Sequence, residues 1–283
     1  MRIVIVGANG QLGSDLSKVL AEYKPICLTH QDIELSCSLN VEKVFKKYHP
    51  HLLINTAAFN NVALCEEEAE KAFQVNTLGV KNLSEYALLY NTILVHISTD
   101  YVFDGKKKKP YTEEDLPFPV NVYGLSKLAG EYIIRYKLKK FFIIRTSALF
   151  GTHICRGKGG NFLDKIFDLY KRKKEIIIVN DEFVSPTYSL DLAKQIKEII
   201  KTTHYGIFHA AGEGFCSWYK FGKTFFDFLG IKIKIIPAKA QDFQQQVKRP
   251  HFSALENKRL KDLKINCMRH WKDALRDYIR EKF

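Results

Sequence analysis

Short apolar runs alternate with amphipathic stretches through the first half of the 283-residue chain. The β-branched run at residues 3–6 is typical of a buried strand, while Leu16, Val19 and Leu20 recur at helical spacing. The pattern predicts strands at Ile3–Val6, Pro25–Leu28, Leu52–Asn55, Thr92–Ser98 and Phe141–Thr146, and helices at Asp15–Tyr23, Val41–Tyr48, Ala69–Tyr90 and Tyr123–Leu138. This alternation predicts an α/β fold with a doubly wound, parallel, Rossmann-type sheet that is covered on both faces.

The second half of the chain is less regular. Its pattern predicts helices at Asn161–Arg172 and Ser189–Ile200, and strands at Glu175–Val179 and Gly206–Ala211. We expect residues 1–150 to form a dinucleotide-binding domain and residues 151–283 to form mainly a smaller C-terminal substrate-binding domain. A segment at about 189–211 is expected to return to the main sheet.

The charge of the chain favours small anionic ligands. The chain carries 44 Lys and Arg against 31 Asp and Glu, for a formal net charge of +13. These basic residues are spread along the sequence, and the tight runs at Lys106–Lys109 and Lys171–Lys174 are typical of solvated loops or faces. No helix-turn-helix, zinc finger or aromatic RNA-binding motif accompanies the charge, so we expect no nucleic-acid partner. A positive field instead helps to capture dinucleotides and nucleotide sugars.

Cysteine usage and hydropathy indicate a cytoplasmic protein. No apolar run reaches the length of a membrane span, and the apolar start runs directly into a glycine turn, so we interpret it as a buried strand rather than a signal peptide. The six cysteines show no CxxC pair and no metal-site spacing; they are Cys27, Cys37, Cys65, Cys155, Cys216 and Cys267. Reduced thiols, no metal and no membrane partner are the simplest interpretation.

A glycine-rich turn lies between the first strand and the first helix. Its GxxGxxG spacing comprises Gly7, Ala8, Asn9, Gly10, Gln11, Leu12 and Gly13. Glycines allow a tight turn and let a diphosphate approach backbone N–H groups at the positive end of a helix. The turn therefore predicts a site for NAD(H) or NADP(H). After the second strand, His30 stands where an acidic residue would favour NAD, so the sequence leans slightly towards NADP and leaves the choice open.

A tyrosine and a lysine, Tyr123 and Lys127, lie four residues apart at the start of a predicted helix. This spacing puts both side chains on one helix face. An ammonium beside a phenol favours the phenolate and lowers the tyrosine pKa, so Tyr123 is the predicted proton donor to a carbonyl oxygen. Thr99 lies at the carboxyl end of the fourth strand, where such sheets bind ligands, and its hydroxyl can bond the same oxygen.

Together these segments resemble the dTDP-4-dehydrorhamnose reductases, a family of extended short-chain dehydrogenases. The resemblance covers nearly the whole chain. Its most specific parts are the STDYVFDG phrase at 98–105 and the proline-spaced stretch before YGLSK at 123–127. The other matching segments include Asn55–Phe59, Phe73–Asn76, Gly130–Glu131, Arg145–Ser147, Gly160–Phe162, Ser185–Thr187, Arg249–Pro250 and Trp271.

The resemblance implies that NAD(P)H reduces the C4 keto group of a dTDP-4-keto-6-deoxy sugar, giving dTDP-L-rhamnose or a close analogue for cell-surface polysaccharide. It implies that Tyr123 is the acid, that Lys127 tunes Tyr123 and holds the cofactor ribose, and that Thr99 orients the carbonyl. The further cofactor contacts that it implies are Asn55, Ala57 and Ala58. The implied substrate contacts are Thr99, Asp100, Tyr101, Asn161, Phe162 and Arg249, with Asn161 and Arg249 facing the pyrophosphate and Phe162 the base. From the residues alone, Asn161 is equally well explained as a helix N-cap.

Several questions stay open at this level. Ala148 stands where the family commonly has Trp, so the identity of the sugar is open. One alternative function is an epimerase or dehydratase on the same scaffold, although no Glu follows Asp100 as a dehydratase would require. Another is a non-catalytic, dinucleotide-binding regulatory subunit similar to that of methionine adenosyltransferase, against which the intact set of Thr99, Tyr123 and Lys127 argues. The oligomeric state is not determined, and a homodimer is one option.

Overall fold

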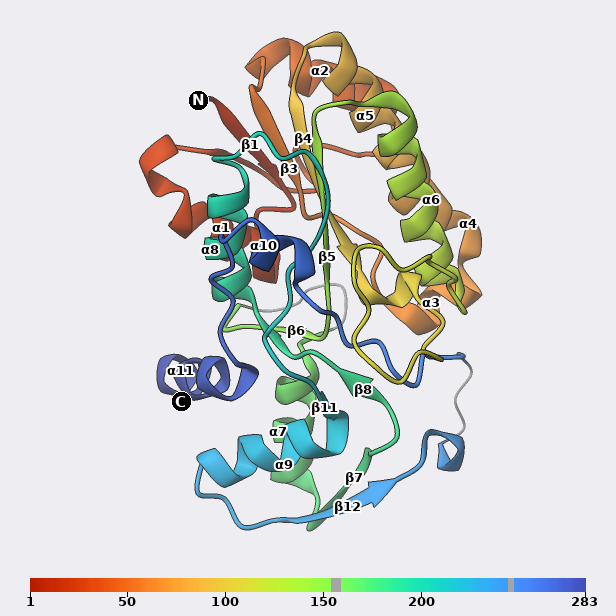
Figure 1. The fold of residues 1–283 in the computed structure, drawn as a ribbon, viewed down its shortest axis with the longest axis vertical. Coiled ribbons are helices and arrows are strands. Elements are labelled where there is room, and N and C mark those ends of the chain that lie inside the picture. The colour runs from red at the N-terminus through yellow and green to blue at the C-terminus, as the bar shows by residue number, and fades with distance from the viewer. Residues whose placement is uncertain (154–158, 244–246) are drawn as a thin grey trace.

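The structure, a computed structural model, describes residues 1–153, 159–243 and 247–283. Its central sheet has six parallel strands in the spatial order β10–β5–β4–β3–β1–β2 (Figure 1). Their bounds are β1 (Ile3–Val6), β2 (Ile26–Leu28), β3 (Leu52–Asn55), β4 (Ile93–Thr99), β5 (Phe141–Thr146) and β10 (Gly206–His209). The predicted α/β fold with a Rossmann-type sheet is thereby confirmed, and the strand order reverses between β1 and β3.

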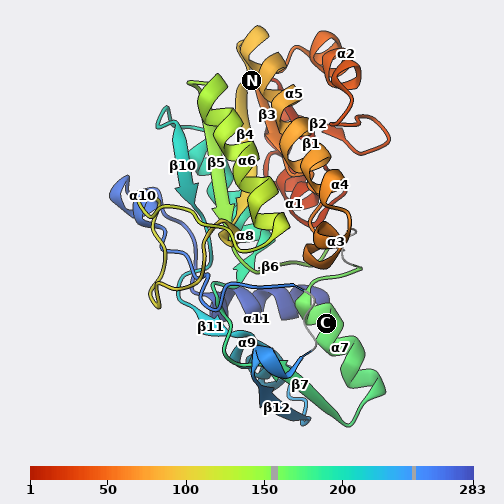
Figure 2. The ribbon, with the colours of Figure 1, turned by 90° about the vertical axis from the view of Figure 1, so that its right-hand side faces the viewer.

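Helices cover both faces of this sheet (Figure 2). The helices α1 (Gln11–Val19) and α8 (Ser189–Ile199) pack together on one face, and the other face is covered by α2 (Ser38–Tyr48), α5 (Gly79–Leu89) and α6 (Val122–Lys137). In β1, Ile3 and Ile5 belong to the core of the first face, whereas Val4 and Val6 belong to the core of the second. Because successive side chains of a strand point to opposite faces, a strand covered on both sides is apolar throughout.

The stretch predicted as one helix over Ala69–Tyr90 is interrupted. It consists of α4 (Ala69–Phe73), a π-helical turn η2 (Gln74–Leu78) and α5. Within the π turn, the buried Asn76 accepts a hydrogen bond from the Phe59 N–H at 2.9 Å and donates to the Phe59 carbonyl at 2.9 Å and to the Ser126 hydroxyl at 3.0 Å. The turn therefore ties the loop after β3 to α6, which is a use often seen for π turns at functional sites.

A second group of elements lies beyond the carboxyl edge of the sheet, in the lower part of Figure 1. Three short strand pairs occur there: β6 (Leu149–Phe150) with β9 (Thr187–Tyr188), β7 (Glu175–Val179) with β12 (Lys234–Ala238), and β8 (Phe183–Val184) with β11 (Cys216–Ser217). The helices α7 (Phe162–Arg172), α9 (Trp218–Phe228) and α11 (Trp271–Lys282) pack around an aromatic core that contains Phe221, Phe225 and Tyr278. The remaining short helices in the described ranges are η1 (Ala21–Tyr23), α3 (Val62–Glu67), η3 (Asp100–Val102), η5 (Ala240–Asp242) and α10 (Lys258–Asp262).

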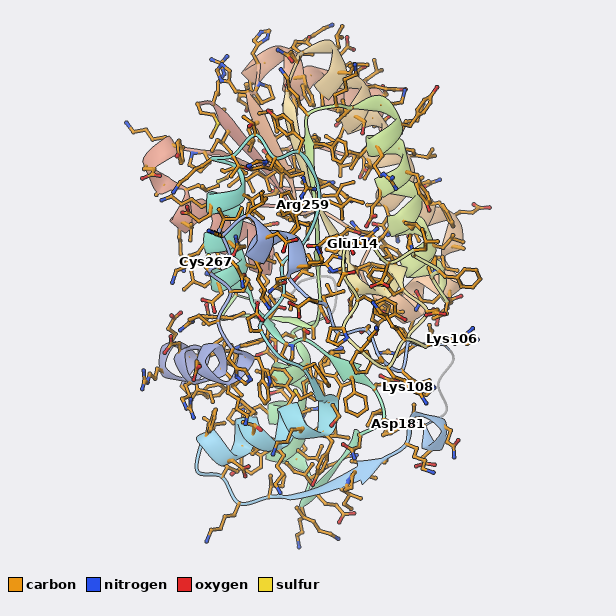
Figure 3. The ribbon with its side chains drawn as sticks, viewed as in Figure 1. Lys106, Lys108, Glu114, Asp181, Arg259 and Cys267 are labelled. Carbon is orange, nitrogen blue, oxygen red and sulfur yellow. The ribbon has the colours of Figure 1, made fainter. Side chains whose placement is uncertain are left out.

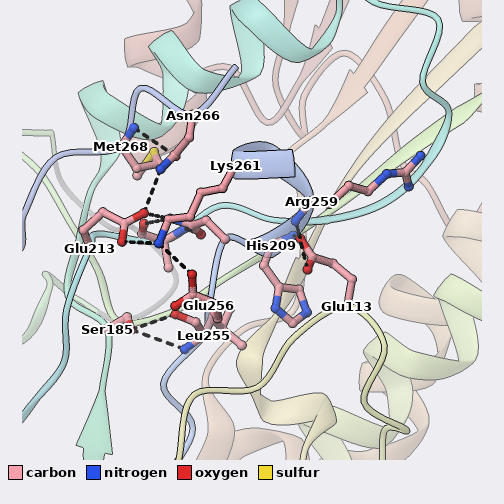
Figure 4. Close-up of polar contacts among 12 residues, drawn as sticks. Glu113, Ser185, His209, Glu213, Leu255, Glu256, Arg259, Lys261, Asn266 and Met268 are labelled. Carbon is pink, nitrogen blue, oxygen red and sulfur yellow. Dashed lines mark hydrogen bonds and ion pairs between the residues drawn. The ribbon is translucent and has the colours of Figure 1, made fainter. Parts of the chain in front are cut away.

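Polar contacts fasten the C-terminal segment against the end of β10 (Figure 4). The Glu113 carboxylate accepts from the backbone N–H of His209 at 2.9 Å and of Arg259 at 3.3 Å. The Lys261 ammonium lies between Glu213, at 2.9 Å, and Glu256, at 2.6 Å. These contacts fix the course of the chain after residue 250 relative to the sheet.

The charged runs lie at the surface. Lys106 and Lys108 are exposed on the loop after η3 (Figure 3), and Lys107 forms an ion pair with Asp115. All four residues of the run at 171–174 are exposed as well. The cysteines in the described ranges are free thiols, and Cys155 lies outside those ranges. Among the described residues, no helix is both long enough and apolar enough to cross a membrane.

Candidate active site

A cavity of about 900 Å³ opens at the carboxyl edge of the sheet. Except for Asn55, all residues that the sequence predicts to bind cofactor or substrate or to carry the chemistry line this cavity. The sheet contributes the glycine turn, the loop after β3 and the end of β4, and the second group of elements contributes α7, β7 and α9. Parallel sheets bind ligands at this edge, close to the point where the strand order reverses.

The glycine turn forms the cavity wall next to β1. Gly7 has φ +79°, and a Cβ at Gly13 would lie only 2.3 Å from the Gly7 carbonyl oxygen. Gly10 is the N-cap of α1, so this helix begins at Gln11 rather than at the predicted Asp15. The first N–H groups of a helix have no partner within it, and here they lie at the cavity wall. The residues present therefore fit the diphosphate of a dinucleotide.

After β2, a histidine faces the cavity, and the nearby Asp32 is hydrogen-bonded within its own loop. His30 lies on the cavity wall. The Asp32 carboxylate accepts from the Thr29 N–H at 2.8 Å and from the Thr29 hydroxyl at 2.9 Å, and these bonds lower the pKa of Asp32. This carboxylate is thereby held within its own loop.

Asn55, the predicted cofactor residue outside the cavity wall, is fully buried at the end of β3. Its Oδ1 accepts from the Ala57 N–H at 3.1 Å, and its Nδ2 lies 3.2 Å from Nδ1 of His96 on β4. Asn55 thus supports the loop with Ala57 and Ala58, which do line the cavity.

Thr99, Tyr123 and Lys127 come together where the end of β4 meets the start of α6. Asn121 is the N-cap of α6, with its Oδ1 accepting from the Gly124 N–H at 2.8 Å, and this places Tyr123 in the first helical turn. The Tyr123 phenol lies beside the Thr99 side chain, which is close enough to lower the pKa of the tyrosine. Lys127 is 2% exposed, one turn further along the same helix.

The electrostatics of this group differ from the sequence prediction that Lys127 lowers the pKa of Tyr123. Burial raises the pKa of Tyr123, and the nearby Thr99 side chain offsets only part of the rise. The Lys127 Nζ points to β4, 2.7 Å from the Ile97 carbonyl oxygen and 3.1 Å from Nε2 of His96. Burial also lowers the pKa of Lys127 to about 8. In the structure the pKa of Tyr123 is thus raised rather than lowered, because burial, which spacing along a helix does not reveal, is the largest effect and the Lys127 ammonium is directed to β4.

Asp100 is held by hydroxyl groups from three parts of the chain. It is 3% exposed and accepts from Thr99 at 3.0 Å, Ser147 at 2.8 Å and Ser253 at 2.5 Å. Burial raises its pKa, against the effect of these three hydrogen bonds. Asp100 therefore joins the end of β4 to the segment that carries Arg249.

Tyr101 and Arg249 form the next part of the wall. Burial raises the pKa of Tyr101, while the charge of Arg249 and a hydrogen bond from it lower that pKa. The Tyr101 ring also packs edge-on against Tyr123, with centroids 5.9 Å apart. A phenol and a guanidinium thus lie side by side on the wall of the cavity.

Asn161 and Phe162 enter the cavity at the start of α7. Asn161 is the N-cap of this helix: its Oδ1 accepts from the N–H groups of Leu163 and Asp164, and its Nδ2 donates to the Gly151 carbonyl at 3.1 Å. The N-cap alternative is therefore the role that the structure displays, and contact with the substrate stays a prediction. Phe162 packs against Trp218, with ring centroids 4.6 Å apart, and both line the cavity.

His96 is the residue that sequence reasoning missed. It is a histidine within an apolar strand and is paired in register with Asn55 of β3. A polar residue directly before Ile97–Ser98–Thr99, in a strand buried on both faces, was the signal that could have revealed it. In the ranges that the structure describes, no group of three or more His, Cys, Asp or Glu side chains is arranged to hold a metal ion.

A Rossmann-type sheet, a glycine turn at a helix N-terminus and a Thr–Tyr–Lys set at the cavity define the class of extended short-chain dehydrogenases. A family model described as "RmlD substrate binding domain" matches residues 1–283, and the chain belongs to this family. The resemblance to dTDP-4-dehydrorhamnose reductases is thereby confirmed.

Individual relatives agree with this assignment. The chain is 35% identical over 283 residues to the spore coat polysaccharide biosynthesis protein SpsK of Bacillus subtilis, covering 99% of this chain and 98% of that protein. It is 38% identical over 235 residues to a dTDP-4-dehydrorhamnose reductase of Aggregatibacter actinomycetemcomitans, covering 80% and 78%. The crystal structure of Bacillus anthracis dTDP-4-dehydrorhamnose reductase in complex with NADP is similar, with a TM-score of 0.94, 34% identity and 99% of both chains covered.

Proposed function

We propose that the protein reduces the C4 keto group of a dTDP-4-keto-6-deoxy sugar with NADPH, converting dTDP-4-dehydrorhamnose to dTDP-L-rhamnose or a close analogue. The observation that carries the proposal is the contact of Thr99 with Tyr123 inside a cavity that has the glycine turn on one wall and Arg249 on another. Family membership supports the substrate class, and the NADP complex of the similar Bacillus anthracis structure supports the cofactor.

In this mechanism, a bound reduced nicotinamide supplies the hydride for the carbonyl carbon. Tyr123 supplies the proton: burial raises the pKa of its phenol, so Tyr123 is protonated at neutral pH and can donate to the carbonyl oxygen as negative charge develops there. Thr99 lies beside the phenol, and its hydroxyl donates to the Asp100 carboxylate at 3.0 Å, which fixes its position. The proton leaves Tyr123 Oη and ends on the hydroxyl of the product.

Other parts of the cavity wall suit the nucleotide part of the substrate. The Arg249 guanidinium, which lies on the wall beside Tyr101, offers several donors in one plane for a diphosphate. Phe162 and Trp218 offer aromatic rings on which a base can pack. Asn161 contributes as the N-cap that fixes Phe162 at the start of α7.

We further propose that the protein acts in the cytoplasm in polysaccharide biosynthesis. The similarity to the spore coat polysaccharide biosynthesis protein SpsK supports the role, and the nucleotide sugar is the proposed partner. The sequence leaves a homodimer as an option, which sedimentation of the purified chain tests.

The absorbance of reduced nicotinamide tests the proposal directly. With dTDP-4-dehydrorhamnose, we expect the wild type to oxidise NADPH, and to oxidise NADH more slowly. Tyr123→Phe removes the proton donor and should lower kcat by roughly 10²–10⁴-fold. Tyr132→Phe makes the same change on the exposed side of α6, where Tyr132 is 50% exposed, and should leave kcat unchanged.

Equal turnover by wild type and Tyr123→Phe would overturn the mechanism. A wild type that binds NADPH but never oxidises it in the presence of the sugar would instead favour a regulatory dinucleotide-binding role.

A further inference from the structure

Three buried polar side chains form a row beneath the cavity, across β3, β4 and α6. Asn55 Nδ2 lies 3.2 Å from His96 Nδ1, and His96 Nε2 lies 3.1 Å from Lys127 Nζ. The exposed fractions of Asn55, His96 and Lys127 are 0%, 1% and 2%. A buried donor needs an acceptor and a buried acceptor needs a donor, so the contacts of this row determine which atoms carry the protons.

The orientation of the Asn55 amide is set by the backbone. The Ala57 N–H can only donate, and it lies 3.1 Å from Asn55 Oδ1, so the NH2 group of Asn55 faces His96. His96 Nδ1 must therefore accept, which makes Nδ1 the unprotonated nitrogen of a neutral ring. The ring proton then lies on Nε2 and points at Lys127.

A hydrogen bond from Nε2–H to Lys127 requires a lone pair on Nζ. A neutral amine has one lone pair and two N–H bonds, and Nζ also lies 2.7 Å from the Ile97 carbonyl oxygen, to which one of these bonds can donate. An ammonium has three N–H bonds and no lone pair, so it would oppose the Nε2–H. All the hydrogen bonds of this row can therefore form together only when Lys127 is neutral.

A charged Lys127 requires a different arrangement of the same three residues. Its ammonium would donate to Nε2, which moves the ring proton to Nδ1. The Nδ1–H would then need Asn55 Oδ1, and turning the amide to provide it breaks the bond from the Ala57 N–H. The alternative of an imidazolium is disfavoured because burial, together with the charge of Lys127, lowers the pKa of His96 well below its usual value.

We propose that His96 is a positioning residue that couples the charge of Lys127 to the orientation of the Asn55 amide, and through it to the Ala57–Ala58 loop. The proton balance is simple: the Nε2 proton passes to Nζ, Nδ1 takes one proton from water, and one proton is bound in total. This inference rests on the proposed function, because it concerns how Lys127 becomes charged beside Tyr123 and beside the loop that the cofactor is predicted to contact.

Other charged groups act on this row from neighbouring elements. On α6, the charge of Glu131 favours the ammonium form of Lys127, but Arg145 of β5 pairs with Glu131 at 2.6 Å. Tyr123 lies on the same helix and is uncharged at neutral pH because burial raises its pKa. From β3, Asn55 faces the row and does not titrate.

The tautomer of His96 is the direct test, measured without cofactor or substrate. In protein labelled with ¹⁵N-histidine, the nine histidines give ring nitrogen signals, and comparison with His96→Gln identifies those of His96. Above the Lys127 transition at about pH 8 we expect the Nε2–H tautomer, and below it the Nδ1–H tautomer. A ring that keeps one tautomer through the Lys127 transition, or that becomes an imidazolium, would overturn the proposal.

Asn55→Asp provides the matched perturbation. A carboxylate accepts from both the Ala57 N–H and Nδ1–H, so we expect the Nδ1–H tautomer at every pH and a Lys127 that stays charged to higher pH. Because the resemblance implies that Lys127 acts in its charged form, loss of that charge is expected to give kcat/KM an alkaline limb, and this limb should move up by about one pH unit in Asn55→Asp. Asn91→Asp, at an exposed position before β4, should change neither measurement.

A merely structural role for the row predicts a lower kcat in Asn55→Asp with the alkaline limb unmoved, and that result would refute the coupling. The NMR measurement needs no turnover, so an enzyme that fails to reduce the sugar but switches tautomer would refute the proposed function and leave the coupling standing.

Discussion

The buried ion pair between Glu131 and Arg145 allows the effect of a substitution on the free energy of unfolding to be predicted. Glu131 is 1% and Arg145 2% exposed, and they meet through two nitrogens at 2.6–3.2 Å. The Ser98 hydroxyl also donates to Glu131 at 2.5 Å. Arg145→Met leaves Glu131 as a buried carboxylate without its cation, which costs about 3–5 kcal/mol of the roughly 5–15 kcal/mol that stabilise a domain.

Thermal unfolding measures this cost. For a chain of this size, we expect the Tm of Arg145→Met to fall by about 5–15 °C. The double variant Glu131→Leu/Arg145→Met removes both charges and should recover most of the loss, apart from about 1 kcal/mol for the unpartnered Ser98 hydroxyl. As a control, Lys258→Met breaks exposed pairs with Glu114 and Asp262 and should change stability by less than about 0.5 kcal/mol. If the double variant lost as much as the sum of its single variants, the reasoning would fail.

Three further predictions follow from other residues of the site. Gly13→Ala places a Cβ 2.3 Å from the Gly7 carbonyl oxygen and should abolish NADPH binding, as measured by nicotinamide fluorescence. Lys127→Met should lose activity yet unfold at a higher temperature than the wild type at pH 7. Burial lowers the pKa of Lys127 from 10.5 to about 8, so the charge of the lysine opposes folding at neutral pH. As the pH rises from about 8 to 10.5, the wild type should therefore gain stability and the variant should not. Ser253→Ala removes one of three hydroxyl donors to Asp100 and should lower the free energy of unfolding, measured with denaturant, by about 1–3 kcal/mol. The control is Ser36→Ala at an exposed position, and an equal effect of the two substitutions would contradict the prediction.

Much of the fold follows from local pattern. The apolar residues of β1 and the glycines after it are enough to place a covered strand and a tight turn, because both requirements are local. The long helix at 69–90 was predicted without its π turn, since Asn76 is turned inward by contacts with Phe59 and Ser126 that periodicity does not show.

The site was less predictable than the fold for a related reason. The spacing of Tyr123 and Lys127 indicates a shared helix face, but it says nothing of desolvation or of the histidine that lies beside the lysine. Likewise, the three hydroxyls on Asp100 come from residues 99, 147 and 253, and only the folded chain brings them together.

The path of the chain limits how the protein can be divided or recombined. A fragment ending at residue 150 would lack α8, which covers one face of the sheet, and β10, which pairs with β5. Such a fragment would present β5 as an open, apolar edge and would aggregate rather than fold. Chimaeras that exchange the second group of elements between relatives therefore need three junctions: one after residue 150 and one on each side of the segment 189–209.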